Sequence, residues 1–300
     1  MVVCPRQKFK WKLRTRTLAL GVRTLLMGIV NVTPDSFSDG GRFMDEEGAT
    51  RHALRLIDEG ADIIDIGGES TRPGEHSEVS AQEEKERVLP VIEAVRRLRP
   101  DAVLSVDTYK AETAREAIHA GAEIVNDVSG LSWDDKMAGV CVEMRCGVAI
   151  MHTRGRWEEW QSLPALSRDE VVPLVYRELQ ERVSAALRAG IRHENIVLDP
   201  GVGFGKRLDE NYPLISRLDE FAKLGYPLMA GASRKGFLGQ SIAARTDGPS
   251  PAIDRRLYAT LAANTAAILG GAHILRVHDV RAALEAAAVA DAVREAAESD

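Results

Sequence analysis

The 300-residue chain is poor in aromatic side chains and in cysteine, and it has no long apolar run. Aromatic residues make up only 5% of the sequence against a hydrophobic share of 45%, so Ala, Val, Leu and Ile must supply most of the core. The cysteines, Cys4, Cys141 and Cys146, are unevenly spaced and form neither a C-x-x-C pair nor a pattern with histidine. This spacing argues against a disulfide framework or a zinc site, and it favours reduced thiols.

An excess of positive charge is also missing. The formal net charge is −6, which argues against a general nucleic-acid or membrane-surface binder but leaves room for a local basic pocket. The basic residues between Arg6 and Arg14 are not followed by the apolar segment of a signal peptide, and no segment is long and apolar enough to span a bilayer. We therefore expect a cytoplasmic protein without nucleic-acid or membrane partners.

The sequence does contain a repeating unit. From Thr24 onward, an amphipathic helix, a glycine, a short apolar strand and polar residues follow one another. The expected strands are residues 25–30, 61–66, 102–106, 123–125, 148–151, 195–198, 227–230 and 272–275. Strands that are apolar on both faces and alternate with helices indicate a parallel sheet. Eight such units are the number that closes into a (β/α)₈ TIM barrel.

This repeat defines one α/β domain, a barrel over residues 24–300, preceded by a short extension. Within residues 1–23, Phe9, Trp11 and Leu13 alternate with basic residues, which predicts a half-buried strand or ribbon that packs on the barrel. A doubly wound open sheet is the structural alternative. However, the sequence shows no dinucleotide-binding fingerprint and nothing that marks a reversal of strand order.

Two segments in the last third of the chain carry more specific expectations. The spacing of apolar residues predicts one helix over residues 210–224. Residues 240–254, which contain a Gly-Pro-Ser-Pro tetrapeptide, predict a long loop after the seventh strand, at the same rim as the first loop. This loop is either a mobile cover or an inert insertion.

Polar side chains stand directly after the expected strands, and in a barrel they converge on one mouth. They are Asn31, Asp65, Asp107, Asn126, His152, Asp199, Ser233, Arg234, Lys235, Arg276 and His278. The carboxylates and amides suit a flat heterocycle with several N–H donors, whereas arginine binds phosphate bidentately. Asn31 offers an oxygen to Mg²⁺, which usually arrives with substrate phosphates and takes few protein ligands.

Each of these residues has a simpler interpretation when taken alone. Asp107 could cap the helix that follows it, and Arg276 could form a structural ion pair with Asp279. Two pattern matches are rejected. Segment 201–207 is not a Walker A loop, because it is one residue too short and carries Arg207 in place of Ser or Thr. A Ser/His/Asp triad is not supported, because the sequence has no G-x-S-x-G elbow. Taken together, the converging residues favour a binding site.

Motifs follow one another along the chain at residues 27–41, 65–74, 105–108, 126–127, 199–206, 233–235 and 276–279. The most specific are Asn-Val-Thr-Pro-Asp-Ser-Phe at 31–37 and Gly-Phe-Gly-Lys at 203–206. In this order they resemble the dihydropteroate synthase family, over nearly everything from Thr24 onward. The resemblance implies a (β/α)₈ barrel that joins 6-hydroxymethyl-7,8-dihydropterin diphosphate to 4-aminobenzoate and releases diphosphate, with Mg²⁺ present. It also implies a homodimer.

The resemblance further implies roles for individual residues. The pterin would be held by Asp107, Asn126, Met151, Asp199, Phe204 and Lys235. The diphosphate would be held by Asn31, Arg72, Arg276 and His278, and Asn31 would also bind the metal ion. The aminobenzoate would be held by Phe37, Thr71, Pro73, Phe204 and Ser233. Catalysis would rest on Asp107, Lys235, Arg276 and His278. An arylamine is a weak nucleophile and no strand-end residue stands out as its base, so we expect an SN1-like substitution in which the diphosphate leaves first.

The sequence departs from the family pattern in its second loop, which is one residue longer, and at residues 152–156 and 258–260. Two alternative functions stay open. A methyltransferase with the same pterin-binding barrel would move a methyl group from a reduced folate to a corrinoid protein, and it would not need Arg276 or His278. A non-catalytic pterin-binding paralogue is the other alternative, and the intact first two loops argue against it.

Overall fold

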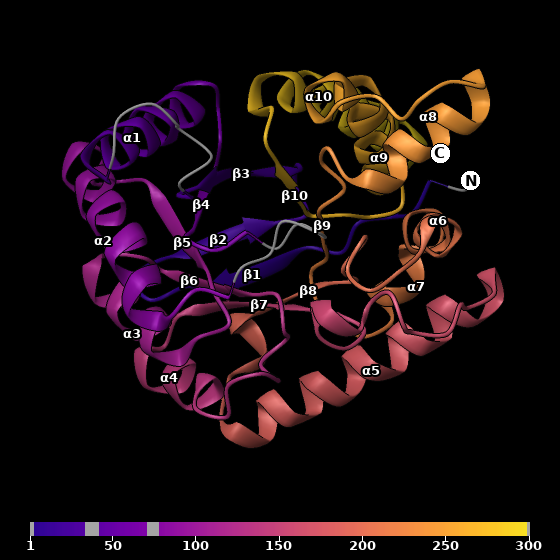
Figure 1. Cartoon of the computed structure of the whole chain (residues 1–300). Helices are drawn as coiled ribbons and strands as arrows, with labels where there is room; N and C mark the ends of the chain where they lie inside the picture. The colour runs from indigo at the N-terminus through magenta and orange to yellow at the C-terminus, as the bar shows by residue number, and fades with distance from the viewer. Residues whose placement is uncertain (1–2, 34–41, 71–77, 299–300) are drawn as a thin grey trace.

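The structure is a computed structural model that describes residues 3–33, 42–70 and 78–298. A sheet of eight parallel strands lies at its centre, and helices surround this sheet (Figure 1). The strands are β3 (Leu25–Asn31), β4 (Ile63–Gly67), β5 (Val103–Asp107), β6 (Ile124–Asp127), β7 (Gly147–Met151), β8 (Ile196–Asp199), β9 (Met229–Ala230) and β10 (Ile274–Val277). The predicted (β/α)₈ barrel is therefore confirmed.

The order of the strands is that of a barrel. From β3 to β8, each strand pairs in parallel with the next strand along the chain, and β10 pairs with both β3 and β9. A parallel bridge between Leu198 and Leu228 joins the end of β8 to the segment before β9 and completes the circle. Since all strands run the same way, their carboxyl ends meet at one face of the molecule.

Helices form the outer layer of the barrel. They are α1 (Arg42–Asp58), α2 (Ala81–Leu98), α3 (Ala111–Ala120), α4 (Met137–Met144), α5 (Arg168–Ala189), α6 (Leu208–Ser216), α7 (Asp219–Ala222), α8 (Gly236–Thr246), α9 (Leu257–Leu269) and α10 (Val280–Glu298). Apolar residues at helical spacing face the strands, as Val88, Ile92 and Val95 do on α2. Among the described helices, none combines the length and the apolar character that a membrane crossing requires.

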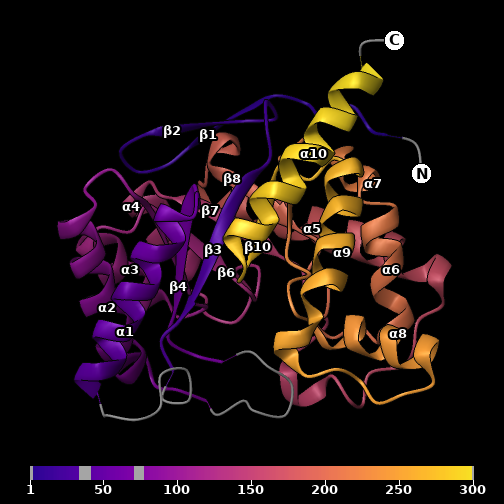
Figure 2. The ribbon, with the colours of Figure 1, turned by 90° about the horizontal axis from the view of Figure 1, so that it is seen from above.

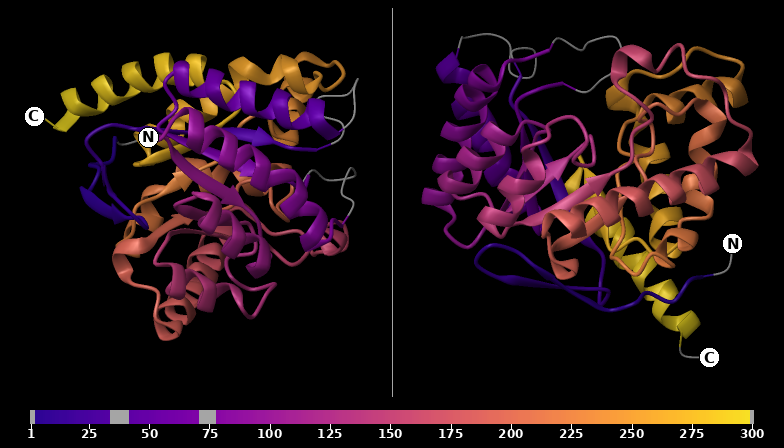
Figure 3. Two further views of the ribbon diagram at one scale, coloured as in Figure 1. Left: turned by 90° about the vertical axis from the view of Figure 1, so that its left-hand side faces the viewer. Right: turned by 90° about the horizontal axis from the view of Figure 1, so that it is seen from below.

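The N-terminal extension is an antiparallel hairpin that covers one end of the barrel. Its strands, β1 (Phe9–Lys12) and β2 (Thr17–Leu20), pair with each other and not with the barrel. Trp11 is fully buried with Met27 in an apolar cluster at the amino ends of the strands, and its indole N–H donates to the carbonyl oxygen of Asn195 (2.8 Å). Figures 2 and 3 show the hairpin across this end, away from α8.

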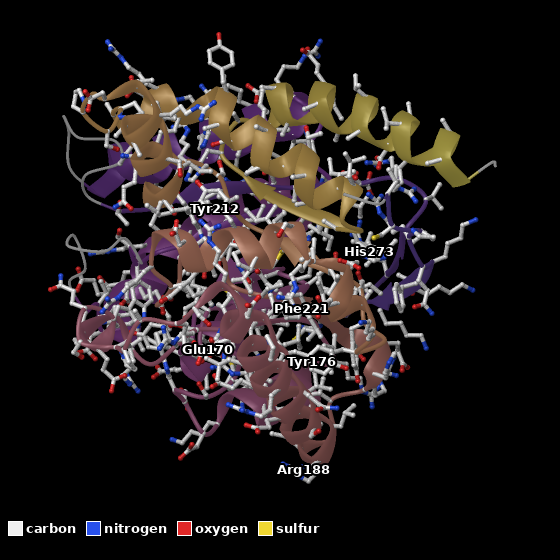
Figure 4. All side chains as sticks on the ribbon, turned by 90° about the vertical axis from the view of Figure 1, so that its right-hand side faces the viewer. Glu170, Tyr176, Arg188, Tyr212, Phe221 and His273 are labelled. Atoms are coloured by element: carbon white, nitrogen blue, oxygen red, sulfur yellow. The ribbon has the colours of Figure 1, made fainter. Side chains whose placement is uncertain are left out.

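The single helix predicted over residues 210–224 is wrong, because the structure has two helices there, α6 and α7. The break falls at Arg217, whose φ and ψ of −121° and 31° are not helical. Leu214 and Phe221 are buried on either side of it, so the apolar spacing continues across the break and hides it in the sequence. Figure 4 shows Phe221 beside Tyr176 of α5, and the two rings stack with centroids 6.5 Å apart.

The long loop predicted over residues 240–254 is also wrong in its first half. Helix α8 continues to Thr246 and ends at Asp247, which adopts a left-handed conformation with a φ of 52°. A 3₁₀ helix, Ile253–Arg256, then leads into α9. The Gly-Pro-Ser-Pro stretch therefore marks the end of a helix, where glycine and proline are common, and not the middle of a long loop.

Candidate active site

A cavity of about 460 Å³ opens at the carboxyl ends of the barrel strands. Of the residues predicted for the site, those that line it are Asn31, Asp107, Phe204, Ser233, Arg234, Lys235, Arg276 and His278. Gln240 of α8 and Arg256 also line it, so the segment after the seventh strand does lie at the mouth. The structure thus brings together side chains from distant parts of the chain, while their individual roles stay predictions.

Arg276 of β10 is at the centre of the buried charges. Its Nε donates to Asp65 Oδ2 (2.7 Å) and its terminal nitrogen to Asp107 Oδ2 (2.5 Å). Burial raises the pKa of Asp107 to about 7, against the opposing effect of Arg276. Burial by itself would lower the pKa of Arg276, but Asp107 and Asp65 outweigh it and raise that pKa above its ordinary value. The arginine therefore stays charged, and it holds the Asp107 carboxylate in place.

Both simpler interpretations of these residues are wrong. At the start of α3, Asp134 Oδ2 accepts the N–H of Ala111 (2.8 Å) and Thr108 Oγ1 that of Lys110 (3.1 Å), whereas Asp107 faces Arg276. Asp279 pairs with Arg234, whose Nε donates to Asp279 Oδ2 (2.9 Å). Because Arg234 has a left-handed φ of 58°, the chain turns sharply between Ser233 and Lys235, and both of these neighbours line the cavity.

Asp65 is a residue for which the resemblance gave no role. It is fully buried on β4, and its Oδ2 accepts from Asn126 Nδ2 (2.9 Å) as well as from Arg276. Asp107 and Asn126 are register partners on β5 and β6. Asp65 therefore connects Asn126, which is predicted to bind the pterin, with Arg276, which is predicted to bind the diphosphate. In the sequence, its position as a carboxylate inside an otherwise apolar strand was the feature that indicated a role in the site.

Asp199 and Lys235 form the second charged part of the site. Asp199 ends β8, is 4% exposed, and accepts the backbone N–H of Gly201 at Oδ1 (2.7 Å). Lys235 precedes α8, and its Nζ lies 4.1 Å from the centre of the Phe204 ring. Burial raises the pKa of Asp199 and lowers the pKa of Lys235 to about 7.

Three predicted pterin residues lie just behind the cavity wall. Met151 is the register partner of Asp199, and it packs with Phe204 in a small apolar cluster. Asn126, Met151 and Asp199 are buried and are not part of the cavity lining. Gly231, however, does line the cavity, and a Cβ at Gly231 would lie 3.8 Å from Asp199 Oδ2. The glycine thus leaves space through which a flat ring can approach Asp199.

The anion side of the cavity is formed by Ser233, His278 and Asn31. Ser233 Oγ accepts the backbone N–H of His278 (3.2 Å) and lies 2.9 Å from Nδ1 of the same histidine. Asn31 is the last residue of β3 and lines the same cavity. No cluster of three or more His, Cys, Asp or Glu side chains that could hold a metal occurs among the described residues.

A second set of side chains at this mouth was not predicted from the sequence. Glu69 lines the cavity and accepts from Tyr109 Oη (3.1 Å) and from Lys110 Nζ. Trp160 also lines it, with its ring edge-on to Phe204 at 5.7 Å. Four other predicted residues lie outside the described part of the chain: Phe37, Thr71, Arg72 and Pro73.

Comparison with known proteins agrees with this geometry. The sequence model of the family described as "Pterin binding enzyme" matches residues 27–278. The dihydropteroate synthase of Escherichia coli (strain K12) is 44% identical over 274 residues, which are 91% of this chain and 93% of that protein. The enzyme of Bacillus subtilis (strain 168) is 43% identical over 271 residues, which are 90% of this chain and 89% of that protein.

A solved structure gives the same result. The dihydropteroate synthase of Xanthomonas albilineans with 4-aminobenzoic acid is 42% identical and has a TM-score of 0.86, and the match covers 96% of this chain and 99% of that one. Sequence and fold therefore agree over almost the whole length of both proteins. The chain belongs to the dihydropteroate synthase family of pterin-binding enzymes.

Proposed function

We propose that this barrel joins 6-hydroxymethyl-7,8-dihydropterin diphosphate to 4-aminobenzoate, giving 7,8-dihydropteroate and diphosphate. The observation that carries the proposal is the meeting of two kinds of charge at one cavity. Asp107 and Asp199 suit the N–H groups of a pterin, whereas Arg276 and His278 suit an anion. A folate-dependent methyltransferase would not need an anion site. The Xanthomonas albilineans relative was solved with 7,8-dihydropteroate, which supports the product.

At the pterin end, Asp199 is the anchor. One of its oxygens is taken by the N–H of Gly201, and the other faces the space beside Gly231. A carboxylate oxygen that accepts from the guanidine-like edge of the pterin makes charge-assisted hydrogen bonds. Asn126, held by Asp65, adds an amide for the remaining edge.

At the reacting end, the diphosphate leaves before the amine attacks. The bond between the pterin methylene carbon and the bridging oxygen breaks, and its electron pair goes to the diphosphate, which Arg276 and His278 stabilise. The methylene becomes cationic beside the carboxylate of Asp107. The lone pair of the aminobenzoate nitrogen then forms the C–N bond, and the nitrogen loses one proton to solvent water.

Magnesium is the metal that fits this donor set. Asn31 would bind it through the side-chain oxygen, and the diphosphate oxygens would supply further ligands. When bound, Mg²⁺ neutralises negative charge on the leaving diphosphate. Arg72, predicted to bind the same diphosphate, lies outside the described residues.

The function is tested by measuring diphosphate release with and without 4-aminobenzoate. Both substrates together should give rapid release and equimolar dihydropteroate. Without 4-aminobenzoate, the dissociative order predicts that labelled oxygen scrambles between the bridging and non-bridging positions of the pterin diphosphate, or that diphosphate escapes slowly. Absence of dihydropteroate would contradict the function. Scrambling that strictly requires 4-aminobenzoate would contradict only the order of steps.

We further propose that the enzyme is a homodimer that uses the α9–α10 side of the barrel. Tyr258, at the start of α9, is 84% exposed. Val289 and Val293, one turn apart on α10, are 67% and 49% exposed. Helices α9 and α10 lie side by side (Figure 2), so these apolar side chains belong to one side of the molecule, and burial against a second copy would remove them from water.

Sedimentation tests the dimer. The wild type is expected at twice the 32.8 kDa of one chain, and the double variant Val289→Glu/Val293→Glu at the monomer mass, because two buried charges at an interface are costly. Leu187→Glu on α5 is the control, since Leu187 is also exposed (42%) but lies on another helix. A wild-type monomer, or a double variant that stays dimeric, would contradict this interface.

A further inference from the structure

Lys206 is a buried cation without a carboxylate partner. It is 7% exposed at the cavity wall, and its Nζ donates to the carbonyl oxygens of His152 (3.0 Å) and Gly201 (2.7 Å). Within the described ranges, no carboxylate oxygen lies within the 4.0 Å of an ion pair with it. An ammonium group that loses its hydration in this way destabilises the fold, and burial lowers its pKa well below the ordinary value. Such a group needs a functional explanation.

Gly201 connects Lys206 to the proposed pterin anchor. The N–H of Gly201 donates to Asp199 Oδ1 (2.7 Å), and the carbonyl oxygen of Gly201 accepts from Lys206 Nζ (2.7 Å). The φ of Gly201 is +68°, and a Cβ there would lie 1.8 Å from the carbonyl oxygen of His152. Only glycine fits this close approach of the loops after β7 and β8. Lys206 bridges the same two loops, so it fixes the residue that holds Asp199.

The charge of Lys206 also acts on Asp199. Burial raises the pKa of Asp199, and the N–H of Gly201 and the charges of Lys235, Lys206 and Arg276 oppose this rise. Lys206 in turn faces three other charged groups, Arg182, Lys235 and Glu178. The cationic groups of this cluster repel one another, whereas Asp199 and Glu178 attract the charge of Lys206. Of these two carboxylates, Asp199 is the one that Gly201 connects to Lys206.

Arg182 provides a comparison within the same chain. It too is a largely buried cation on carbonyl oxygens, donating to those of Ser129 (3.0 Å), Met151 (2.5 Å) and Thr153 (2.9 Å). Its charge acts on Asp199 less than those of Lys235, Lys206 and Arg276 do. Arg182 thus braces loops as Lys206 does, but with a weaker electrostatic effect on Asp199.

We propose that Lys206 is a positioning residue for pterin recognition, which holds Asp199 in place through Gly201 and keeps this carboxylate ionised. The inference rests on the proposed function, in which Asp199 binds the pterin. Lys206 acts through Asp199 and not on the reacting atoms. This explains why a lysine, and not an apolar residue, follows the glycine-rich turn although no carboxylate of the described residues lies within ion-pair distance of it.

Calorimetric titration with 6-hydroxymethylpterin at a series of pH values tests the proposal. Binding requires ionised Asp199, so affinity falls as the pH falls through the pKa of this residue. Removing a nearby cation raises that pKa. Lys206→Met is therefore expected to move the acid limb of binding upward by about one pH unit, so that the affinity on this limb falls about 10-fold at a given pH. Lys206→Arg, which keeps the charge, should leave the limb in place.

Arg182→Met is the matched control, because it removes a buried cation that braces loops but acts less on Asp199. It should move the acid limb less than Lys206→Met does. The proposal is overturned if the acid limb of pterin binding does not move in Lys206→Met, or if it moves as far in Arg182→Met as in Lys206→Met. If circular dichroism shows that Lys206→Met is unfolded, the neutral N–H donor of Lys206→Gln replaces it with the same expectation. Failure of the wild type to bind the pterin would instead overturn the proposed function.

Discussion

Replacing Asp107 by Asn is expected to lower kcat by about 10²- to 10³-fold, while pterin affinity falls by less than about 10-fold. The Asp107 carboxylate is held by Arg276 (2.5 Å) at the cavity wall before any substrate binds. A fixed negative charge favours a methylene that becomes cationic as the diphosphate leaves, so it stabilises the transition state more than the ground state. The amide keeps the shape of the side chain but not the charge. Steady-state kinetics and calorimetry separate the two effects.

The pH dependence of the same variant gives a second measurement. Asp107 has to be ionised and Lys235 protonated, and each has a pKa of about 7. The kcat/KM of the wild type should therefore fall on both sides of a maximum near neutral pH. Asp107→Asn should lose the part of the acid limb that Asp107 causes, retain the part that Asp199 causes, and keep the alkaline limb. Asp101→Asn, just before the opposite end of β5, is the control and should retain wild-type kinetics. Equal losses of kcat and affinity would contradict a charge effect on the transition state.

Much of the barrel could be predicted because its signals are local. An apolar run such as residues 25–30 forms a strand that is buried on both faces, and the glycine after a helix fits a short turn. The errors arose where local signals mislead. The spacing of buried residues runs across the break at Arg217, and the glycine and prolines after Thr246 end a helix that the sequence did not mark as one.

The members of the site could be predicted better than their partners. Parallel strands bring their carboxyl ends together, so strand-end residues such as Asp107 and Arg276 were expected near one another. Which carboxylates Arg276 contacts depends on register across four strands and on side-chain direction, and Asp65 is 211 residues away from it in sequence. The acceptors of Lys206 are backbone carbonyl oxygens, which carry no sequence signal.

The Asp199→Asn variant is expected to weaken binding of 6-hydroxymethylpterin by about 100-fold, or about 2.7 kcal/mol. The amide oxygen of Asn can still accept the N–H of Gly201, as Asp199 Oδ1 does at 2.7 Å. Its NH₂ group then takes the place of Oδ2, beside Gly231 in the cavity wall. An N–H donor would therefore meet the N–H donors of the pterin. The variant loses a charge-assisted pair and gains a mismatch, while the contact that holds the loop survives.

This expectation separates recognition from folding. Because the bond to Gly201 is kept, Asp199→Asn should show the circular dichroism of the wild type and a thermal midpoint within a few degrees of it. Asp209→Asn on α6, whose side chain is 64% exposed, is the matched control and should bind the pterin as the wild type does. A folded Asp199→Asn variant with unchanged pterin affinity would show that the anchor lies elsewhere, and it would also remove the basis for assigning Lys206 a part in pterin recognition.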